Sequence, residues 1–391
     1  MRECFRKSVF HITGTLVIVR RTSPQTQKLF RCVPSSSCYS TATATATATG
    51  SSKEQSFTVN YLINKFGFYP ESALSASKYL ILQNSEKPDS VVAFLRNYGF
   101  SDAQLNNIFR RVPPLLLSNP TETLSPKLRF LLFKGASTTQ LLRIVSTNPV
   151  FLHRSLQNRS VPNFNLLKGF LQSDERTIVS IYRNPFLICS DTLQHQIDFL
   201  LDVGFRKPCI TRLLYQWPSL LICNIDCLRN KVDEIRKLGI DPSRASFVPA
   251  MYAKELPKAT LDKKVELYKR WGWTDDAISK AFVKHPFCML ISDRKLEDGL
   301  DFFINNMGLD PLVLASYPVI LSLSLKKRIV PRASVLQFLQ SKDLIKNGIN
   351  AAAFFVTEKV FLQRYVIKFM DEAPQLLKLY EEKMNLSAMD K

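Results

Sequence analysis

The sequence predicts an all-α fold, an α-solenoid of either hand built from helix–turn–helix repeats of about 35 residues. Three features recur together: a proline followed by large apolar residues, a glycine 14 residues before it, and a helix-capping residue two positions after the glycine. One unit of this size cannot bury its apolar face, so neighbouring units must stack. We expect at least seven units between about residue 90 and Pro331.

The proline column marks the turn of each unit. The markers are Pro113, Pro149, Pro185, Pro218, Pro286 and Pro318. The longest step, 68 residues, contains two units, and Ala253 stands where the proline between them would be.

The glycine column marks the end of a helix, because glycine adopts the left-handed C′ conformation without steric cost. It comprises Gly99, Gly135, Gly204, Gly239 and Gly272; Leu171 fills this position in the third unit, and Gly308 lies only ten residues before Pro318. The residues two positions later are expected to begin the next helix. They are Ser101, Ser137, Ser173, Arg206, Asp241, Thr274 and Asp310.

Two helices are therefore expected in each unit. The first runs about ten residues and stops before the proline, which cannot continue it. The Pro-x-Leu-Leu stretch then forms a short apolar turn. A longer helix follows, for which Ser125 would be the N-cap and Pro126 the first residue in one unit.

The first 53 residues have the composition of an organelle transit peptide: rich in Arg and Ser, with Glu3 as the only acid. Beyond them we expect a degenerate repeat over 54–89, the repeat array over 90–331 and a helical cap and tail over 332–391. The whole chain has a net charge of +20. Removing residues 1–53 leaves 45 basic and 32 acidic residues, a net charge of +13.

Catalysis and metal binding are not predicted. The chain has no GxxxxGK[ST], HExxH or GxSxG motif, and its few histidines, His153, His195 and His285 after the leader, offer little general-base chemistry. Cys223 and Cys227 lie four residues apart, but zinc would need two more ligands. We expect no enzyme activity, no cofactor and no metal.

Cations recur on the short helices. The positions six and two residues before the marker proline share one helix face, and at least one cation stands there in five units. The apolar residues at positions eight and four before the proline face the other way. Stacked units would align these cations into a ladder that suits the regular phosphates of a nucleic acid, although Lys and Arg are also common on solvated helix faces. The ladder comprises Arg111, Arg143, Arg183, Arg212, Lys280 and Lys284.

The densest basic cluster follows the last repeat. It comprises Lys326, Lys327, Arg328 and Arg332, and the nearby sequence contains Pro331 and no acid, so we expect an exposed basic elbow. The tryptophans, Trp217, Trp271 and Trp273, lie beside marker residues, which favours core packing over base stacking.

The proline and glycine columns, together with both ends of the chain, resemble the plant branch of the mitochondrial transcription termination factor (mTERF) family. The stretch from Ser324 to Arg332, SLKKRIVPR, resembles a signature of plant members. The segments 57–74 and 355–374 resemble their entry and C-terminal segments. The resemblance spans about residues 57–380, and the missing glycine at Leu171 and missing proline at Ala253 are departures from it.

The resemblance implies a nucleic-acid-binding protein of organelle gene expression. Double-stranded DNA or structured RNA would be its partner, and transcription termination, transcription initiation or intron splicing its role. It would bind as a monomer without membrane insertion, in the mitochondrion or alternatively the chloroplast. A scaffold that binds transcription or splicing proteins is the alternative of another class.

Overall fold

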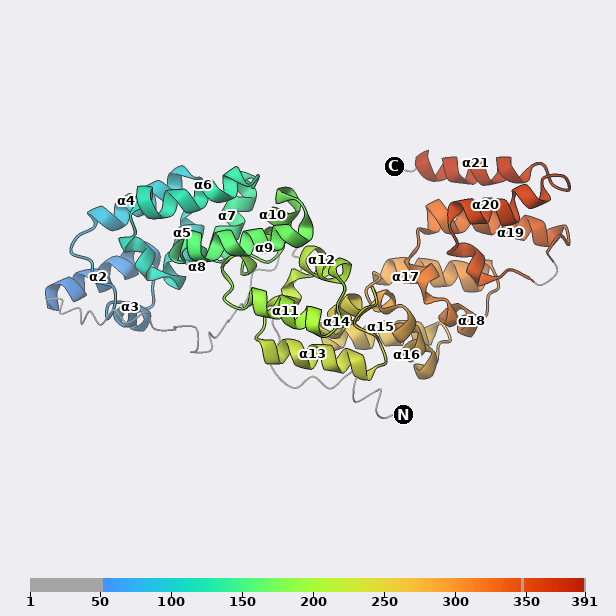
Figure 1. The fold of residues 1–391 in the computed structure, drawn as a ribbon, viewed down its shortest axis with the longest axis horizontal. Coiled ribbons are helices and arrows are strands. Elements are labelled where there is room, and N and C mark those ends of the chain that lie inside the picture. Colours follow the sequence, from blue (N-terminus) through green and yellow to red (C-terminus); the bar gives the residue numbers. More distant parts are fainter. Residues whose placement is uncertain (1–51, 346–347, 390–391) are drawn as a thin grey trace. The chain divides into compact units, whose positions relative to one another are not determined.

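The computed structural model describes residues 52–345 and 348–389, and over these residues the chain forms helices and no strand (Figure 1). The described chain divides into two compact units. The N-terminal unit comprises residues 52–203 and 210–228, and the C-terminal unit comprises residues 204–209 and 229–389. The predicted all-α repeat fold is confirmed. The expected leader lies outside the described residues except for its last two, Ser52 and Lys53, with which helix α2 begins.

The N-terminal unit begins at α2 and reaches the start of α13. Its elements are α2 (Ser52–Phe66), α3 (Pro70–Ala76), α4 (Glu86–Asn97), α5 (Asp102–Arg111), η1 (Pro113–Leu117), η2 (Pro120–Leu124), α6 (Ser125–Phe133), α7 (Thr138–Thr147), α8 (Val150–His153), η3 (Leu156–Ser160), α9 (Val161–Leu171), α10 (Asp174–Arg183), η4 (Leu187–Cys189) and α11 (Leu193–Asp202). The division between the units falls within α12 (Lys207–Gln216) and α13 (Ile225–Lys237), which flank η5 (Pro218–Leu221).

The C-terminal unit continues the same alternation. Its elements are α14 (Phe247–Lys254), α15 (Lys258–Arg270), α16 (Asp275–Lys284), η6 (Pro286–Met289), α17 (Asp293–Asp301), η7 (Phe302–Asn306), α18 (Pro311–Ser316), η8 (Pro318–Ser322), η9 (Leu325–Ile329), α19 (Val330–Ser341), η10 (Ala351–Phe354), α20 (Glu358–Tyr365), η11 (Ile367–Phe369) and α21 (Leu376–Met389). Across the described residues, every helix is too short or too polar to cross a membrane.

The longer helices end at a left-handed glycine, as predicted. Gly99, Gly135 and Gly204 adopt φ angles of +96°, +90° and +104°, the left-handed region in which glycine is favoured. In the third unit the left-handed residue is Gln172, with φ +60°, one position after the predicted Leu171, which is the last residue of α9.

Most of the predicted N-cap residues cap a helix, but two of them, Asp241 and Ser125, do not. Ser101 accepts a hydrogen bond from the backbone N–H of Gln104 in a capping box. Asp241 does not cap a helix: its carboxylate accepts from the backbone N–H of Ser243 in a turn, and α14 begins only at Phe247. Ala253 then lies inside α14, because alanine, unlike the missing proline, does not stop the helix.

Ser125 is not the N-cap of the longer helix. The helix begins one turn earlier at Pro120, with Asn119 as the cap, and its first turn is π-helical. Such wide turns also precede α9 and α19. Pro126 therefore lies one turn inside the helix, where the irregular hydrogen bonding of the wide turn accommodates a residue without an N–H.

The core comes from the apolar positions of the short helices and from the turns after the prolines. Leu105, Phe109, Leu141 and Val145 are at most 1% exposed, as the pattern predicts. Leu115 and Leu116 of the first turn are also fully buried. Burial of apolar surface between stacked repeats is thus the main source of stability.

Buried polar side chains join five of the longer helices to the turn of the next repeat. Asn163 Nδ2 lies 3.1 Å from the carbonyl oxygen of Leu187 and 2.8 Å from that of Ser190. The last carbonyls of a helical turn have no partner within it, so a donor from outside satisfies them. We call these residues the inter-repeat donors: Lys127, Asn163, Gln196, Lys264 and Arg332.

Arg332 is the most enclosed inter-repeat donor, with no exposed surface. Its guanidinium Nη1 donates to the carbonyls of Ala353 and Val356 at 3.0 and 2.8 Å. The guanidinium carbon lies 4.6 Å from the centre of the Phe361 ring, and Nη2 lies 3.6 Å from a carboxylate oxygen of Glu358. Arg332 therefore fixes η10 and α20 to α19.

The glycine column gives a first prediction. Replacing Gly135 with alanine should destabilise the fold by about 1–2 kcal/mol, because no neighbour lies near the new Cβ and the cost is the left-handed backbone alone. Gly169→Ala is the matched control: it lies inside α9 with equally open space, and it should stabilise by up to about 1 kcal/mol. Urea unfolding measures both, and shifts of the same sign would contradict the assignment.

The burial of Arg332 gives a second prediction. Arg332→Met should lower the free energy of unfolding by about 3 kcal/mol, because the carbonyl of Ala353 loses its charged donor and those of Phe354 and Val356 keep only Arg328. Lys327→Met on the adjacent exposed turn should change it by less than about 0.5 kcal/mol. Equal unfolding midpoints for the two variants would show that Arg332 is not a structural residue.

Candidate nucleic-acid interface

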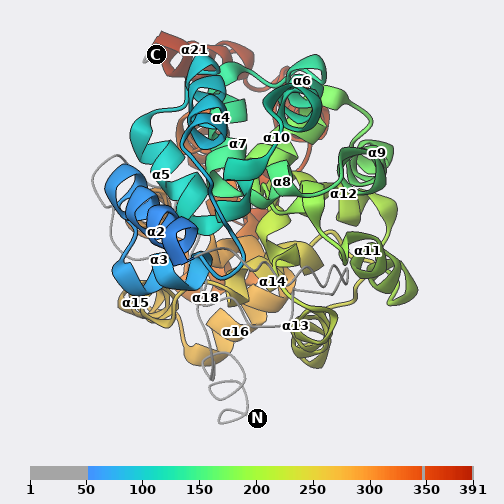
Figure 2. The same cartoon turned by 90° about the vertical axis from the view of Figure 1, so that its left-hand side faces the viewer.

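The short helices of successive repeats pack on one another and present an exposed edge. In the N-terminal unit, α5 packs against α7 and α7 against α10, as Figures 1 and 2 show; in the C-terminal unit, α16 packs against α18. The predicted ladder positions lie on such an edge within each unit, and all but one of the ladder cations are exposed. The exposed ones are Arg111, Arg143, Arg183, Lys280 and Lys284, while Arg212 is half-buried.

Ladder cations two residues before the proline also bind the next repeat. Arg111 Nη1 lies 2.6 Å from the carbonyl oxygen of Thr147, at the end of α7. Lys284 Nζ lies 3.3 Å from the carbonyl oxygen of Ser316, at the end of α18. A cation at a helix C-terminus pairs with the partial negative charge of the exposed carbonyls, so these side chains also stabilise the stack.

Arginine and tyrosine alternate across α7, α10 and α12. The Arg143 guanidinium lies 4.4 Å from the centre of the Tyr182 ring and donates to its hydroxyl at 2.9 Å. The Arg183 guanidinium lies 4.6 Å from the centre of the Tyr215 ring and donates to the Tyr215 carbonyl. These cation–π contacts hold both arginines in fixed positions on the exposed edge.

Lys280 has an acidic neighbour on its own helix. Its ammonium lies 2.8 Å from a carboxylate oxygen of Asp276, and 72% of its side chain is exposed. An exposed pair of this kind contributes little to stability, so the lysine can exchange the carboxylate for another anion at small cost.

The basic cluster divides into an exposed and an enclosed half. Lys326 and Lys327 are exposed on the π-turn η9. Arg328 is half-buried and donates to the carbonyls of Phe354, Phe355 and Val356 at 3.1, 3.0 and 2.6 Å.

The expected exposed elbow is therefore wrong for Arg332, which is fully buried, and only partly right for Arg328. Both arginines resemble the other inter-repeat donors: they stand in the first turns of a longer helix and donate to backbone carbonyls of the next turn, η10. The chain segment that covers them begins more than twenty residues later, so the local sequence gives no sign of their burial.

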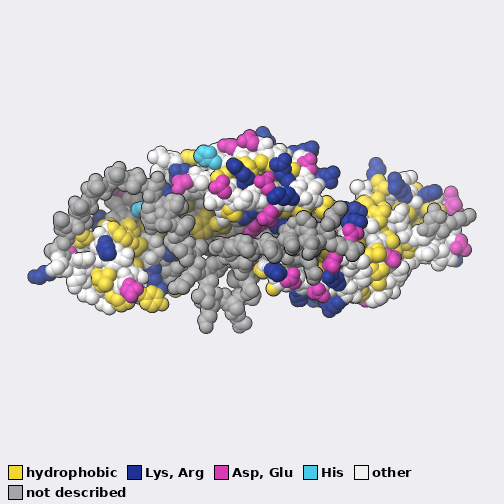
Figure 3. Space-filling view, turned by 90° about the horizontal axis from the view of Figure 1, so that it is seen from below, with side chains coloured by type: hydrophobic (Ala, Val, Ile, Leu, Met, Phe, Trp, Pro, Cys, Tyr) yellow, Lys and Arg dark blue, Asp and Glu magenta, His cyan; other side chains and the backbone are white. Residues whose placement is uncertain are grey.

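Acids stand among the cations on the surface. Figure 3 shows one face on which Lys and Arg side chains lie beside Asp and Glu side chains. Asp293 pairs with one exposed and one buried lysine: Lys263 and Lys264 donate to its carboxylate at 2.7 and 2.5 Å. These hydrogen bonds, from Lys263 first and then Lys264, lower the pKa of the Asp293 carboxyl to about 2.

The aromatic and metal-ligating candidates do not gather into a site among the described residues. Trp273 is buried and stacks on Tyr268, with 4.5 Å between ring centres, which confirms core packing there; Trp217 and Trp271 are half-buried. His285 shares a hydrogen bond of 2.8 Å with the Ser322 hydroxyl. Over the described chain, no three His, Cys, Asp or Glu side chains lie close enough together to hold a metal ion.

The inter-repeat donors were not predicted, although the sequence carries a signal for them. Lys127, Gln196 and Lys264 each lie eight residues before a marker glycine. A polar residue that recurs at a fixed position of a buried helix face indicates a structural hydrogen bond. The three residues differ in charge and size, so no single residue type marks the position.

Known proteins with similar sequences are organellar transcription factors by name. The chain is 23% identical over 66% of its length to "Transcription termination factor MTERF8, chloroplastic" of Arabidopsis thaliana, covering 51% of that protein. It is 24% identical, also over 66% of its length, to "Transcription termination factor 1, mitochondrial" of Homo sapiens, covering 55% of it. The chain thus spans about half the length of these relatives. The sequence profile of the mTERF family matches residues 92–190 and 187–362, well over half of the chain, and the protein belongs to the mTERF family.

Proposed function

We propose that this protein binds organellar nucleic acid, double-stranded DNA or structured RNA, and regulates gene expression in the organelle. The observation that carries the proposal is the exposed edge of the short helices, on which cations recur from repeat to repeat. Phosphates recur along a nucleic acid, and a row of cations binds them by charge and counterion release. The names of the relatives, as transcription termination factors, support the same role.

Arg183 keeps donors for a phosphate while it holds the next repeat. A guanidinium carries five N–H donors, and the contact of Arg183 with the backbone carbonyl of Tyr215 engages only part of them. The same cation can thus fix the stack and bind a phosphate. Lys326 and Lys327 on η9 extend the proposed surface, whereas buried Arg332 positions this turn from behind.

The finer role and the compartment rest on the relatives and on the leader. We propose transcription termination or initiation as the regulated step, because the relatives carry the first of these in their names. We propose the mitochondrion as the compartment, because Arg richness and the near absence of acids in residues 1–53 fit mitochondrial import.

The proposal predicts binding that weakens steeply with salt. Fluorescence anisotropy with labelled duplex DNA and duplex RNA, across a salt series, should give a log–log slope of about −0.9 per phosphate contact on B-DNA. A slope near zero, or no binding to either duplex at low salt, would overturn the proposal. The two duplexes also show which nucleic acid is preferred.

A variant of the exposed turn tests the surface itself. Lys326→Gln with Lys327→Gln should lower duplex affinity about tenfold or more and reduce the salt slope by about 2, one per phosphate-bound lysine. Lys378→Gln on α21 is the matched control, with a side chain 81% exposed, and it should leave both quantities unchanged. If the double variant behaves like the control, the η9 turn is not part of the interface.

A further inference from the structure

The α17 helix of the C-terminal unit makes its inter-repeat contact from another position than the other longer helices. The residues eight and nine before the left-handed Gly308 are Leu300, which is buried, and Gly299, and neither has a donor that can reach the next turn. Lys295, one helical turn earlier, donates to the carbonyl of Ser322 at 2.6 Å instead.

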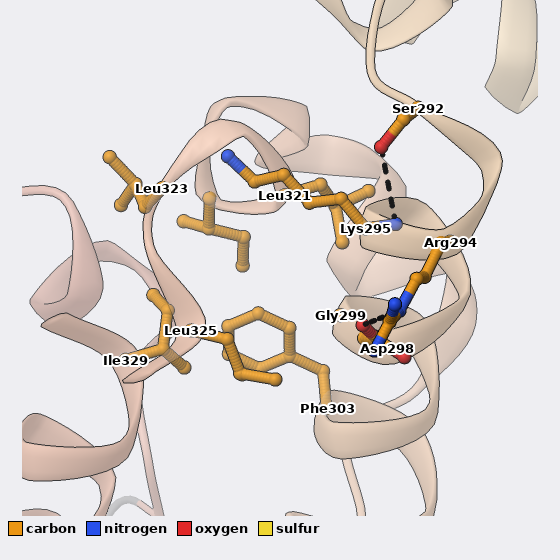
Figure 4. A pocket seen from close by; sticks show the side chains of 11 residues that line it. Ser292, Arg294, Lys295, Asp298, Gly299, Phe303, Leu321, Leu323, Leu325 and Ile329 are labelled. Carbon is orange, nitrogen blue, oxygen red and sulfur yellow. Dashed lines mark hydrogen bonds and ion pairs between the residues drawn. The ribbon is translucent and has the colours of Figure 1, made fainter. Parts of the chain in front are cut away.

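A groove lies between α17 and the turns η8 and η9. Its volume is about 340 Å³, and Figure 4 shows Phe303, Leu325 and Ile329 around it. A Cβ added at Gly299 would lie 3.4 Å from a methyl carbon of Leu321, so a longer side chain at this position would extend into the groove.

The floor of the groove is aliphatic and aromatic, and the polar residues around it are already bonded. Ser292 accepts from the backbone N–H of Lys295, and Arg294 lies 3.9 Å from a carboxylate oxygen of Asp298. A nucleobase buried here would leave the polar atoms of its edges without partners, at a cost in free energy. A large aliphatic side chain has no such atoms, so the floor favours a protein ligand.

The rim of the groove is mostly cationic. The side chain of Arg294 is 93% exposed, and Lys295 is exposed with one of its three ammonium donors engaged. Lys326 and Lys327 follow Leu325 on the same turn and are exposed. Asp298 is the one acidic residue among those that line the groove. Acidic residues on either side of an inserted aliphatic side chain would therefore complement this rim.

We propose that this groove is a docking site for an acidic segment of a partner protein, which inserts one or two large aliphatic side chains beside Leu325 and Phe303. The inference goes beyond the proposed function. The rim of the groove shares Lys326 and Lys327 with the proposed nucleic-acid surface, so the groove is tested through Leu325, which carries no charge.

The test uses the full chain and a fluorescein-labelled peptide in which two leucines stand among glutamates. Anisotropy should show saturable binding that is lost when the leucines become serines and falls when the glutamates become lysines. Leu325→Gln, which keeps the charge of the turn, should weaken peptide binding about tenfold. Leu312→Gln, at a leucine 47% exposed on α18 outside the groove, is the matched control and should leave it unchanged.

Thermal unfolding confirms that both variants are folded, and a labelled single-stranded oligonucleotide is measured in parallel. Absence of saturable peptide binding, or equal binding by the two variants, would overturn the proposal. Loss of oligonucleotide affinity in Leu325→Gln with unchanged peptide affinity would also overturn it, because the groove would then hold a base. Duplex binding by Leu325→Gln at the affinity of the unchanged chain would separate this result from the proposed function.

Discussion

The structure depends on hydrogen bonds that reach from one repeat to the backbone carbonyls of the next. Helices and turns of this length leave their last carbonyls without partners, and a stack of short elements multiplies such ends. Asn163, Gln196 and Arg332 satisfy them from the longer helix, and Arg111 from the short helix. Apolar burial drives the stacking, but these bonds fix the register in which the repeats meet, because an unpaired buried carbonyl is costly.

Because some cations make these inter-repeat bonds, not every Lys and Arg is available to bind a phosphate. Lys127 and Arg332 are buried and serve the fold, whereas Lys326, Lys327 and Lys280 are exposed. The ladder arginines share features of both groups, since they bind the neighbouring repeat and are also exposed. The net charge of +20 therefore includes cations that are buried and cannot bind a phosphate. The exposed cations of the short helices are a more specific basis for nucleic-acid binding.

The repeat architecture was predictable from the sequence because glycine and proline act through local backbone geometry. Left-handed Gly135 and the helix end before Pro149 follow from single residues and their neighbours. The start of the longer helix was misplaced because Asn119 and the wide turn after it were not recognised as a helix beginning. The burial of Arg332 could not be predicted, because it depends on a segment that the fold brings over it from a later part of the chain. The ladder cations are mostly exposed, as the helix pattern predicts, but their bonds to the next repeat were not predicted.

The direction of these bonds has a consequence for how such chains change in length. In each of the pairs described, the donor lies in the earlier repeat and the acceptor in the later one. In these pairs the donors, like the acceptors, lie at corresponding positions of their repeats. Duplication or deletion of a whole repeat thus keeps these donors facing the carbonyls of a following turn, while a break within a repeat separates a donor from its carbonyl. Gene rearrangements in multiples of one repeat are consequently the ones this architecture tolerates.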